Sequence, residues 1–324
     1  MDETENCGQS FFPTASHRNL IARSQLLQDL RNFFTSRSFI EVETPVISAD
    51  TVVDRYLEPI AVRLDETDRW LQTSPEFAMK RLVASGMTAI FQITRAFRNE
   101  EFGPLHNPEF TMLEWYRVGE SYAHGMDFLD ELCTSILGHT TVDRMTYRDA
   151  FRRFANIDPL DAKVEELSSV VEGRDVQIPV TMKKADRDEW LNLILAEIVE
   201  QRLREFGAVI LFDYPITQAA LAKTSDVDPR VAERFELYVD GIELANGYHE
   251  LVDSSELKRR NQRTNEKRSE DGKCLLPVNS RMLQAIEYGL PACTGVALGV
   301  DRLLMKRVGA KEISEVIAFP FDIA

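Results

Sequence analysis

The sequence predicts an α+β fold in which a mainly antiparallel sheet is flanked by helices, in a single domain. Apolar and polar residues alternate over residues 91–116 and again over residues 230–251, and a turn signal interrupts each run, which predicts two hairpins. Apolar residues recur at intervals of three and four over residues 18–36 and in much of residues 120–206, which predicts helices. Strands joined by short loops pair antiparallel, so the hairpins would supply the sheet and the helices its cover.

Length and composition are those of a globular protein. The chain has 324 residues, of which 44% are hydrophobic and 28% charged, and it can bury a core in one or two domains; we favour one. No apolar run approaches the roughly 18 residues of a membrane span, and the polar start MDETENCGQS lacks a signal-peptide pattern, so we expect a cytoplasmic protein without a membrane partner. The four cysteines show no CxxC or histidine spacing, which argues against structural zinc and a disulfide framework.

The acidic charge bears on the choice of partner. The formal net charge is -15. Nucleic acids are bound largely through lysine and arginine side chains that neutralise phosphates, so this surface as a whole would repel tRNA. The one densely basic segment, residues 258–268, is interpreted as the solvated face of a helix. We therefore do not expect tRNA as a partner.

The N-terminal part begins with a lead-in, a helix and a strand. Residues 1–16 are polar and aperiodic, and we expect them to be loosely ordered. The apolar stripe from Arg18 to Ser36 predicts an amphipathic helix, and the alternating residues Phe39–Thr44 predict a strand that Pro45 ends.

A short strand over residues 70–73 is expected to lead into a helix from Phe77 to Ala84. Ser74, Pro75 and Glu76 open that helix, because proline is tolerated in a first turn and a carboxylate is favoured by the positive helix end. A capping carboxylate is the ordinary interpretation of Glu76.

The first hairpin, residues 91–116, has one chemically active face. Strand residues of like parity point the same way, so the even-numbered side chains of both strands would face one cavity if Glu100 lies opposite Phe110. Taken alone, an arginine between carboxylates is more simply an exposed ion pair worth about 0–1 kcal/mol. The side chains expected on the active face are Thr94, Arg98, Glu100, Phe110, Met112, Glu114 and Tyr116, with His106 and Asn107 at the lip of the cavity.

Residues 120–206 are expected to be mainly helical and to form an insertion packed on the sheet. Apolar stripes over residues 126–137 and 190–203 predict helices, and the charged stretch 158–177 between them is weakly patterned. No pattern of residues in this part indicates a catalytic or binding site. A strand over residues 208–214 follows, and a proline ends it.

The second hairpin, residues 230–251, would turn at Asp240-Gly241, because a type I′ turn needs positive φ at both positions. With those residues as the loop, Glu236 is expected opposite Ala245 and diagonal to Glu243 on the same face. Two carboxylates so placed can share a divalent ion, and Mg²⁺ needs only one or two of them. Strict alternation would put Glu250 on the other face, so a shared pocket requires a β-bulge, which we expect at residues 246–247.

The C-terminal part is predicted to hold two helices and a strand-to-helix segment. Helices are expected over residues 254–270 and 280–288, and glycines end both. The segment TGVALGVDRL, residues 294–303, would run from a glycine-punctuated strand into a helix.

Three segments, in this order, resemble the motifs of class II aminoacyl-tRNA synthetases of the lysyl, aspartyl and asparaginyl group. The helix, strand and proline of residues 18–45 resemble motif 1, which in that family builds a dimer interface. The residues FRNE (97–100) with HNPEFTMLEWY (106–116) resemble motif 2, and residues 294–303 resemble motif 3. The resemblance implies a class II synthetase-like antiparallel sheet, a homodimer, and one catalytic domain over residues 17–324.

The resemblance also implies a reaction, in which an amino-acid carboxylate attacks the α-phosphate of ATP to give an acyl-adenylate and pyrophosphate. Two unit negative charges at about 4 Å repel by about 4 kcal/mol at an effective dielectric near 20. Arg98 and Arg302 would offset this repulsion as the catalytic residues, with Mg²⁺ on Glu236 and Glu243. The residues implied for ATP are Arg98, Asn99, Glu100, His106, Asn107, Phe110, Glu243, Leu244, Gly299 and Arg302.

The amino-acid end of this expected pocket is acidic. No lysine stands among the matched positions, and buried carboxylates without cations are costly, so the ligand should bring its own ammonium groups, as lysine or a lysine isomer does. The residues implied for the amino acid are Ser74, Pro75, Glu76, Glu114, Tyr116, Asn246, Glu250 and Ala297.

The chain as a whole is most similar to the EpmA family, also called PoxA or GenX, whose lysyl-tRNA-synthetase-like ligases modify a lysine of elongation factor P. A lysyl-tRNA synthetase has an N-terminal OB-fold that reads the anticodon, whereas here the motif 1 helix begins near residue 18. Ser74, where synthetases usually have alanine, and Ala297, where they have the first glycine of motif 3, would add atoms to the pocket wall. This fits the family's preferred substrate, (R)-β-lysine, which would pass to the ε-amine of a lysine on the acceptor.

Two other functions stay open on the sequence. A truncated synthetase could charge tRNA through its acceptor stem, and would transfer labelled lysine to tRNA instead of a protein. A catalytically inactive paralogue could bind amino acids and regulate a partner. Such paralogues often lose the transition-state arginines, whereas Arg98, Arg302, Glu236 and Glu243 are all present here.

Overall fold

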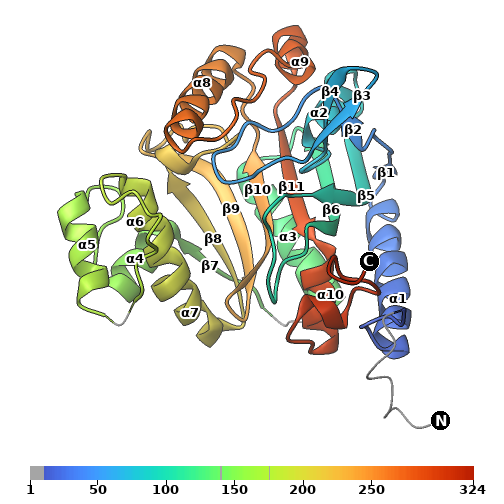
Figure 1. Cartoon of the computed structure of the whole chain (residues 1–324), viewed down its shortest axis with the longest axis horizontal. Helices are drawn as coiled ribbons and strands as arrows, with labels where there is room; N and C mark the ends of the chain where they lie inside the picture. The colour runs from blue at the N-terminus through green and yellow to red at the C-terminus, as the bar shows by residue number, and fades with distance from the viewer. Residues whose placement is uncertain (1–10, 139–140, 175) are drawn as a thin grey trace.

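The computed structural model describes residues 11–138, 141–174 and 176–324. An eight-stranded sheet with strand order β1-β5-β6-β11-β10-β9-β8-β7 forms its centre (Figure 1). The inner pairs are antiparallel, and only the edge pairs β1–β5 and β7–β8 are parallel. The strands are β1 (Ile40–Glu41), β5 (Ala89–Phe97), β6 (Glu109–Val118), β7 (Asp143–Thr146), β8 (Ala208–Pro215), β9 (Val231–Val239), β10 (Ile242–His249) and β11 (Cys293–Gly299).

Helices and a small second sheet surround this centre. The three-stranded sheet has the order β2-β4-β3, with β2 (Ile47–Ser48), β3 (Ala61–Leu64) and β4 (Thr67–Leu71). The predicted α+β class, an antiparallel sheet flanked by helices, is confirmed. The α-helices are α1 (His17–Thr35), α2 (Glu76–Ala84), α3 (Tyr122–Leu137), α4 (Tyr147–Ala155), α5 (Val164–Glu172), α6 (Arg187–Ile194), α7 (Glu200–Leu203), α8 (Ser254–Glu270), α9 (Arg281–Gly289) and α10 (Val300–Val308).

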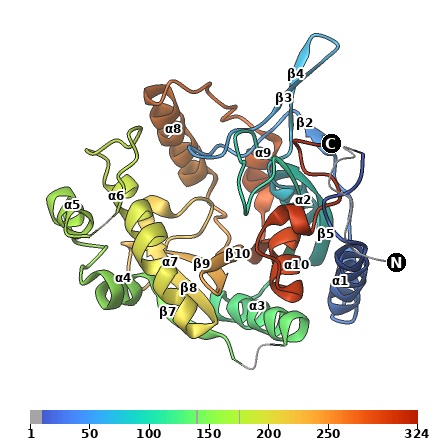
Figure 2. The same cartoon turned by 60° about the horizontal axis from the view of Figure 1, so that its bottom comes forward.

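Alternation along β5 and β6 divides their side chains between the two faces of the sheet. Odd-numbered residues such as Phe91, Leu113 and Trp115 are buried in the largest apolar cluster, together with residues of α1, α3 and α10. Figure 2 shows these three helices along one side of the molecule. Even-numbered Glu114 and Tyr116 point to the opposite face, where α2, α8 and α9 pack. This parity places the chemistry on one face and the main core on the other.

The register of the first hairpin differs from the expected one. Phe110 lies opposite Ala96, not Glu100, and Phe97 pairs with Glu109, so each residue of β6 pairs four positions earlier in β5, farther from the loop, than predicted. The difference is an even number of residues, and the even-numbered side chains therefore keep a common face. Glu100 instead lies in the loop, exposed, with a φ of 66°.

The second hairpin turns at Asp240-Gly241, as predicted, with φ values of 47° and 71°. Its bulge is at Leu244, between Glu243 and Ala245, and not at residues 246–247; as a result Glu236 lies opposite Asn246 instead of Ala245. The extra residue reverses the alternation, so Glu243 and the even-numbered residues after the bulge line one pocket.

The segment 120–206 is mainly helical, as expected, but it also contributes β7 to the sheet edge, a strand that the pattern did not predict. Its first helix, α3, belongs to the main core, whereas α4–α7 and a π-helical turn at Leu195–Val199 form a separate cluster against β8. The division into a lead-in (1–16), a catalytic domain (17–324) and an insertion (120–206) stays a prediction.

Two local expectations are wrong. Residues 11–16 are not loose: Thr14 donates to the carbonyl of Ser314 at 2.7 Å and Ala15 is buried, while residues 1–10 lie outside the described range. The basic segment 258–268 is not simply a solvated face either, because Arg268 is fully buried and donates to the carbonyls of Asp54 and Cys274. Among the described residues, no helix is both long and apolar enough to cross a membrane.

Candidate active site

One cavity of about 560 Å³ opens on the face of the sheet opposite the main core. It gathers nearly all residues that the sequence analysis singled out for substrate, nucleotide or metal, although their roles stay predictions. Pro75, Asn99 and Glu100 do not line it. The expected residues that do are Ser74, Glu76, Arg98, His106, Asn107, Phe110, Glu114, Tyr116, Glu236, Glu243, Leu244, Asn246, Glu250, Ala297, Gly299 and Arg302.

At one end of the cavity a guanidinium lies over an aromatic ring. The Arg98 guanidinium carbon is 5.0 Å from the centre of the Phe110 ring, and its Nη1 is 3.4 Å from Glu101. The buried Nε of Arg98 has no hydrogen-bond partner among the described residues. Orphaned buried donors are costly, so this group is available for an anion that enters the cavity.

Arg302, at the start of α10, is held by the backbone. It donates to the carbonyl oxygens of Leu105 at 3.2 Å and Glu243 at 3.0 Å, and it contacts the ring of His106. Partial burial and the Arg302 charge lower the pKa of His106, so its ring is neutral at pH 7. Asn107 lines the cavity, and its amide also donates to the carbonyl of Glu109 and accepts from the backbone N–H of Phe321, which fixes the loop.

The two expected metal carboxylates have unequal surroundings. Both oxygens of Glu236 accept hydrogen bonds, from Arg234 on one side and from the hydroxyls of Tyr214 and Tyr238 on the other. Glu243 lies 4.0 Å from Arg302, and burial together with the neighbouring Glu236 raises its pKa. The negative charge of the Glu243 carboxylate is therefore only partly neutralised by the protein, and a bound cation could neutralise the rest.

At the other end, carboxylates crowd together. Glu114 is fully buried and accepts hydrogen bonds from the hydroxyls of Ser74 and Tyr116, each at 2.6 Å. Burial, followed by the charge of Glu76, raises the pKa of Glu114 to about 7. Burial raises the pKa of Glu250 further, to about 8. Ser74 also accepts from the backbone N–H of Glu76, so serine, not Glu76, caps the start of α2.

The sequence analysis missed a lysine at this end. Lys80 is 1% exposed, and its Nζ lies 2.6 Å from Glu76 and 2.5 Å from Glu250. The expectation that the acidic end has no protein cation is therefore wrong. The signal was present, because Glu76 and Lys80 are four residues apart and so share one face of α2.

A glycine forms part of the pocket floor. A Cβ built on Gly295 would lie 2.2 Å from Glu250 Oε1 and 2.4 Å from the Tyr116 ring, so only glycine fits without movement. On the adjacent strand β10, Asn246 donates to the Tyr248 hydroxyl at 3.0 Å and leaves its carbonyl oxygen buried without a partner among the described residues. Ala297 pairs with both Glu114 and Asn246, which places it between the flanking strands at the same level.

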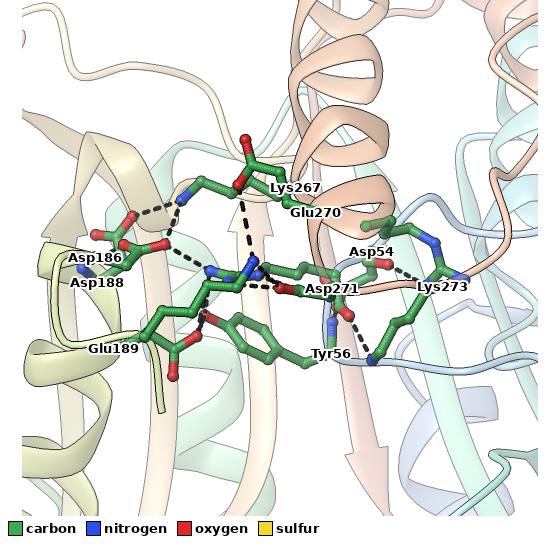
Figure 3. A network of polar contacts seen from close by, with 12 residues as sticks. Asp54, Tyr56, Asp186, Asp188, Glu189, Lys267, Glu270, Asp271 and Lys273 are labelled. Atoms are coloured by element: carbon green, nitrogen blue, oxygen red, sulfur yellow. Dashed lines mark hydrogen bonds and ion pairs between the residues drawn. The ribbon is translucent and has the colours of Figure 1, made fainter. Parts of the chain in front are cut away.

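An ionic cluster, defined by Arg55, Asp186, Asp188, Lys267 and Asp271, lies beside the cavity, and Arg55, Asp188 and Lys267 line it. Figure 3 shows Asp186, Asp188, Lys267 and Asp271 within this network of polar contacts. Arg55, in the loop between β2 and β3, contacts Asp186 before α6 and Asp271 after α8, each at 2.7 Å. Lys267 reaches Asp186 and Asp188 at 3.3 and 3.5 Å. The hydrogen bond from Arg55 lowers the pKa of Asp271. Three segments far apart in the sequence are thus joined beside the cavity.

Comparisons with known proteins agree with the site. A model of the family described as tRNA synthetases class II (D, K and N) matches residues 10–323. The chain is also similar to a protein of Vibrio vulnificus (strain YJ016) named elongation factor P--(R)-beta-lysine ligase. The two are 44% identical over 318 residues, which cover 96% of this chain and 98% of that protein. These matches confirm the resemblance predicted from the three motifs.

Proposed function

The chain belongs to the class II tRNA synthetase family (D, K and N), and we propose that it activates (R)-β-lysine, or lysine, with ATP and transfers it to a lysine of elongation factor P. The observation that supports this most directly is a single cavity with arginines at one end and buried carboxylates at the other. The name of the 44% identical relative specifies the same acceptor and amino acid. Since the acceptor is a translation factor, the enzyme would act in the cytoplasm.

In the first step, a carboxylate oxygen of the amino acid forms a bond to the α-phosphorus of ATP. The bond between that phosphorus and the oxygen bridging to the β-phosphate breaks, and pyrophosphate leaves. Arg98 offers an unpaired Nε and a planar guanidinium between the two anions. No nucleophilic side chain is needed, because the substrate supplies the nucleophile and the protein supplies position and charge.

The nucleotide would lie between Phe110 and the strand pair β10–β11. Phe110 can stack on adenine, with Arg98 lying on the same ring. Arg302 lies at the helix start next to the strand end and can hold the triphosphate. Glu100 is outside the cavity, so the backbone at Leu244, where the bulge interrupts the β10–β9 ladder, is the better group for reading the adenine edge.

Magnesium fits the cavity through one or two carboxylates. The described residues contain no group of three or more histidine, cysteine, aspartate or glutamate side chains arranged for a metal. Mg²⁺ usually takes one or two protein carboxylates and otherwise binds phosphate and water. Burial and the neighbouring Glu236 raise the pKa of Glu243 despite the nearby Arg302, and Glu236 is held beside it by two tyrosines and an arginine. The ion would neutralise phosphate charge.

In the second step, the ε-amine of the acceptor lysine attacks the acyl carbon of the adenylate. A C–N bond forms, the bond to the phosphate oxygen breaks, AMP leaves and the amine gives a proton to water. The acceptor would approach from the cavity mouth.

The choice of isomer would depend on Ser74 and Ala297. The Ser74 hydroxyl is fixed between Glu114 and the backbone of Glu76, so its oxygen occupies a defined part of the wall. The methyl group of Ala297 lies at the level of Glu114 and Asn246. Both would displace the amino group from its α-lysine position toward one that a β-amine fills.

A homodimer is proposed on the exposed apolar surface of the motif 1 unit. Ile21 on α1, Ile40 on β1 and Ile47 on β2 are 60%, 57% and 40% exposed. β1 is also the edge of the large sheet. An exposed apolar patch at a sheet edge is typical of an interface between copies. Sedimentation of wild-type protein and the Ile40→Glu variant tests it, and a monomeric wild type would contradict it.

The function is tested by incubating the protein with ATP, one lysine isomer and purified elongation factor P, and by weighing the factor by mass spectrometry. We expect a mass increase of one lysyl group on a single lysine, larger with (R)-β-lysine than with α-lysine. The same incubation with tRNA and labelled lysine is the control. Acylated tRNA with unmodified factor would refute the proposal in favour of a truncated synthetase.

A further inference from the structure

Lys80 is a buried ammonium group that the reaction above does not use. Its Nζ contacts Glu76 Oε1 and Glu250 Oε2, at 2.6 and 2.5 Å, and lies 5.9 Å from the centre of the Tyr116 ring. The two carboxylates line the cavity, whereas Lys80 does not. Lys80 therefore lies behind them, where no ligand would touch it.

The contacts leave two carboxylate oxygens for a ligand. Lys80 occupies one oxygen of each partner, and Glu250 Oε1 is buried without a hydrogen bond among the described residues. Gly295 has no side chain that could cover that oxygen, since even a Cβ would lie 2.2 Å from it. Lys80 thus fixes the positions of both carboxylates and leaves their other oxygens to the cavity.

The effect of Lys80 follows from the charges of the side chains at the amino-acid end of the cavity. Glu76, Glu114 and Glu250 can together contribute three negative charges, and Lys80 returns one positive charge. The fully ionised amino-acid end then has two negative charges. A diamino acid brings two ammonium groups and neutralises them, while its carboxylate lies at the arginine end.

We propose that Lys80 is a positioning residue that limits the charge of the amino-acid end to two negative charges and so selects a substrate with two ammonium groups. This inference rests on the proposed function, because it assumes that an amino acid occupies this end of the cavity. Burial of unpaired charge is costly, so once Glu114 and Glu250 are ionised an occupant with one ammonium group leaves one carboxylate unpaired and is rejected.

Without Lys80, a carboxyl group of the cavity would take up a proton, which would reduce the excess negative charge. Lys80 is the group that lowers the pKa of Glu250 most, against the raising effect of burial. A proton on Glu250 could then replace a missing ligand ammonium group. The cavity would therefore accept a ligand of lower charge.

The test is ATP–pyrophosphate exchange with (R)-β-lysine and with its analogue that lacks the terminal amino group. For the wild type we expect a preference for the diamino acid of at least about a hundredfold in kcat/KM. Lys80→Met, similar in length but uncharged, should reduce that preference by at least about tenfold through KM for the amino acid, with KM for ATP unchanged. Arg81→Met removes one charge from the exposed face of the same helix and should leave the preference unchanged.

A second variant tests the same charge limit and remains informative if Lys80→Met does not fold. Glu76→Gln leaves Glu114, Glu250 and Lys80, a limit of one negative charge, so the preference should move toward the mono-amino analogue by at least about tenfold. The double variant Lys80→Met/Glu76→Gln restores a limit of two charges, and should regain preference for the diamino acid relative to Glu76→Gln. Removing Lys80 thus has opposite effects in the two backgrounds.

The outcomes separate the two hypotheses. If Glu76→Gln lowers the rates with both substrates equally, or if the Lys80 substitution has the same effect in both backgrounds, the charge limit is refuted and Lys80 only fills space. If the wild type shows no exchange with either lysine isomer, the proposed function is refuted instead. Thermal unfolding by circular dichroism confirms which variants fold.

Discussion

Buried carboxyl groups at the amino-acid end of the cavity make stability depend on pH in an unusual direction. The pKa of Glu250 is raised to about 8 and that of Glu114 to about 7, in both cases chiefly by burial. In the unfolded chain both titrate near 4.3. Between these values the folded state binds more protons than the unfolded state, so the free energy of unfolding falls as the pH rises.

The magnitude follows from Glu250 alone, because its titration is coupled to that of Glu114 and the two effects do not add. A group with a pKa of 8 in the folded state and about 4.3 in the unfolded state loses about 2 kcal/mol of stability between pH 6 and pH 8. Lys80, whose pKa is raised, and Asp271, whose pKa is lowered, contribute constant stability over this window. His106, whose pKa is lowered, acts in the opposite direction over the lower part of this window, because the folded state then binds fewer protons than the unfolded state.

The assay is thermal unfolding at pH 6, 7 and 8, with and without saturating (R)-β-lysine. At about 2 °C per kcal/mol for a chain of this size, the Glu250 contribution alone should lower Tm of the free protein by about 4 °C from pH 6 to pH 8. The ligand ammonium groups pair with ionised carboxylates, so the rise in Tm on ligand binding should grow over the same range. Glu250→Gln, which does not titrate, is the control and should lessen the fall by about this amount, whereas Glu243 and Glu200, whose pKa values are raised to about 7, keep their contributions.

A flat or rising Tm of the free protein between pH 6 and pH 8 would refute the reasoning, because Glu250 would then be ionised throughout. A fall that persists unchanged in Glu250→Gln would assign the effect to other carboxyl groups.

Four substitutions test the remaining parts of the site. Arg98→Ala should lower ATP–pyrophosphate exchange by about a thousandfold or more with Tm unchanged, and near-normal exchange would contradict its role. Gly295→Ala puts a methyl group 2.2 Å from Glu250, so KM for the amino acid should rise at least about tenfold; an unchanged KM would show that the floor moves freely. Ala297→Gly should reduce the preference for (R)-β-lysine over α-lysine, measured as the kcat/KM ratio of the two isomers. An unchanged ratio would show that Ala297 does not select between the isomers. Arg55→Met leaves carboxylates of the ionic cluster unpaired and should cost about 3 kcal/mol in urea unfolding, and a loss below 1 kcal/mol would refute the cluster's importance.

Local patterns in the sequence predicted the sheet and which faces its side chains share. Alternation in the two hairpins has a period of two, so the even-numbered residues of β6 from Phe110 to Tyr116 share the cavity face with Arg98 even though the register was wrong, whereas Glu100 does not. Positive φ at Asp240 and Gly241 was predictable because few residues tolerate it.

The position of the bulge could not be derived. Any extra residue between Glu243 and Glu250 brings both to one face, and Asn246-Gly247 was the natural guess. Gly247 is needed for another reason: a Cβ there would lie 2.5 Å from the Phe235 ring, so it allows close packing on the neighbouring strand. Glycine in a strand indicates a bulge or a close approach, and the sequence does not distinguish them.

Ion pairs between residues far apart in the chain could not be predicted from the sequence either. Arg55 contacts Asp186 and Asp271, and no local period relates three charges that lie on segments far apart in the sequence. Lys80 was different, because its spacing from Glu76 was visible. Lys80 lies outside the three motif segments, so its contact with the acidic end was not predicted.

The bulge at Leu244 makes the length of β10 more important than the identity of most of its side chains. One added residue determines which way the second half of the strand faces, so losing it would turn Asn246, Tyr248 and Glu250 toward the main core and leave the cavity without its acidic wall. Exchanging one side chain alters one contact, whereas deleting one residue would move all three of these side chains to the other face of the sheet. Tolerated variation between Glu243 and Glu250 should therefore consist of replacements, with the number of residues kept constant.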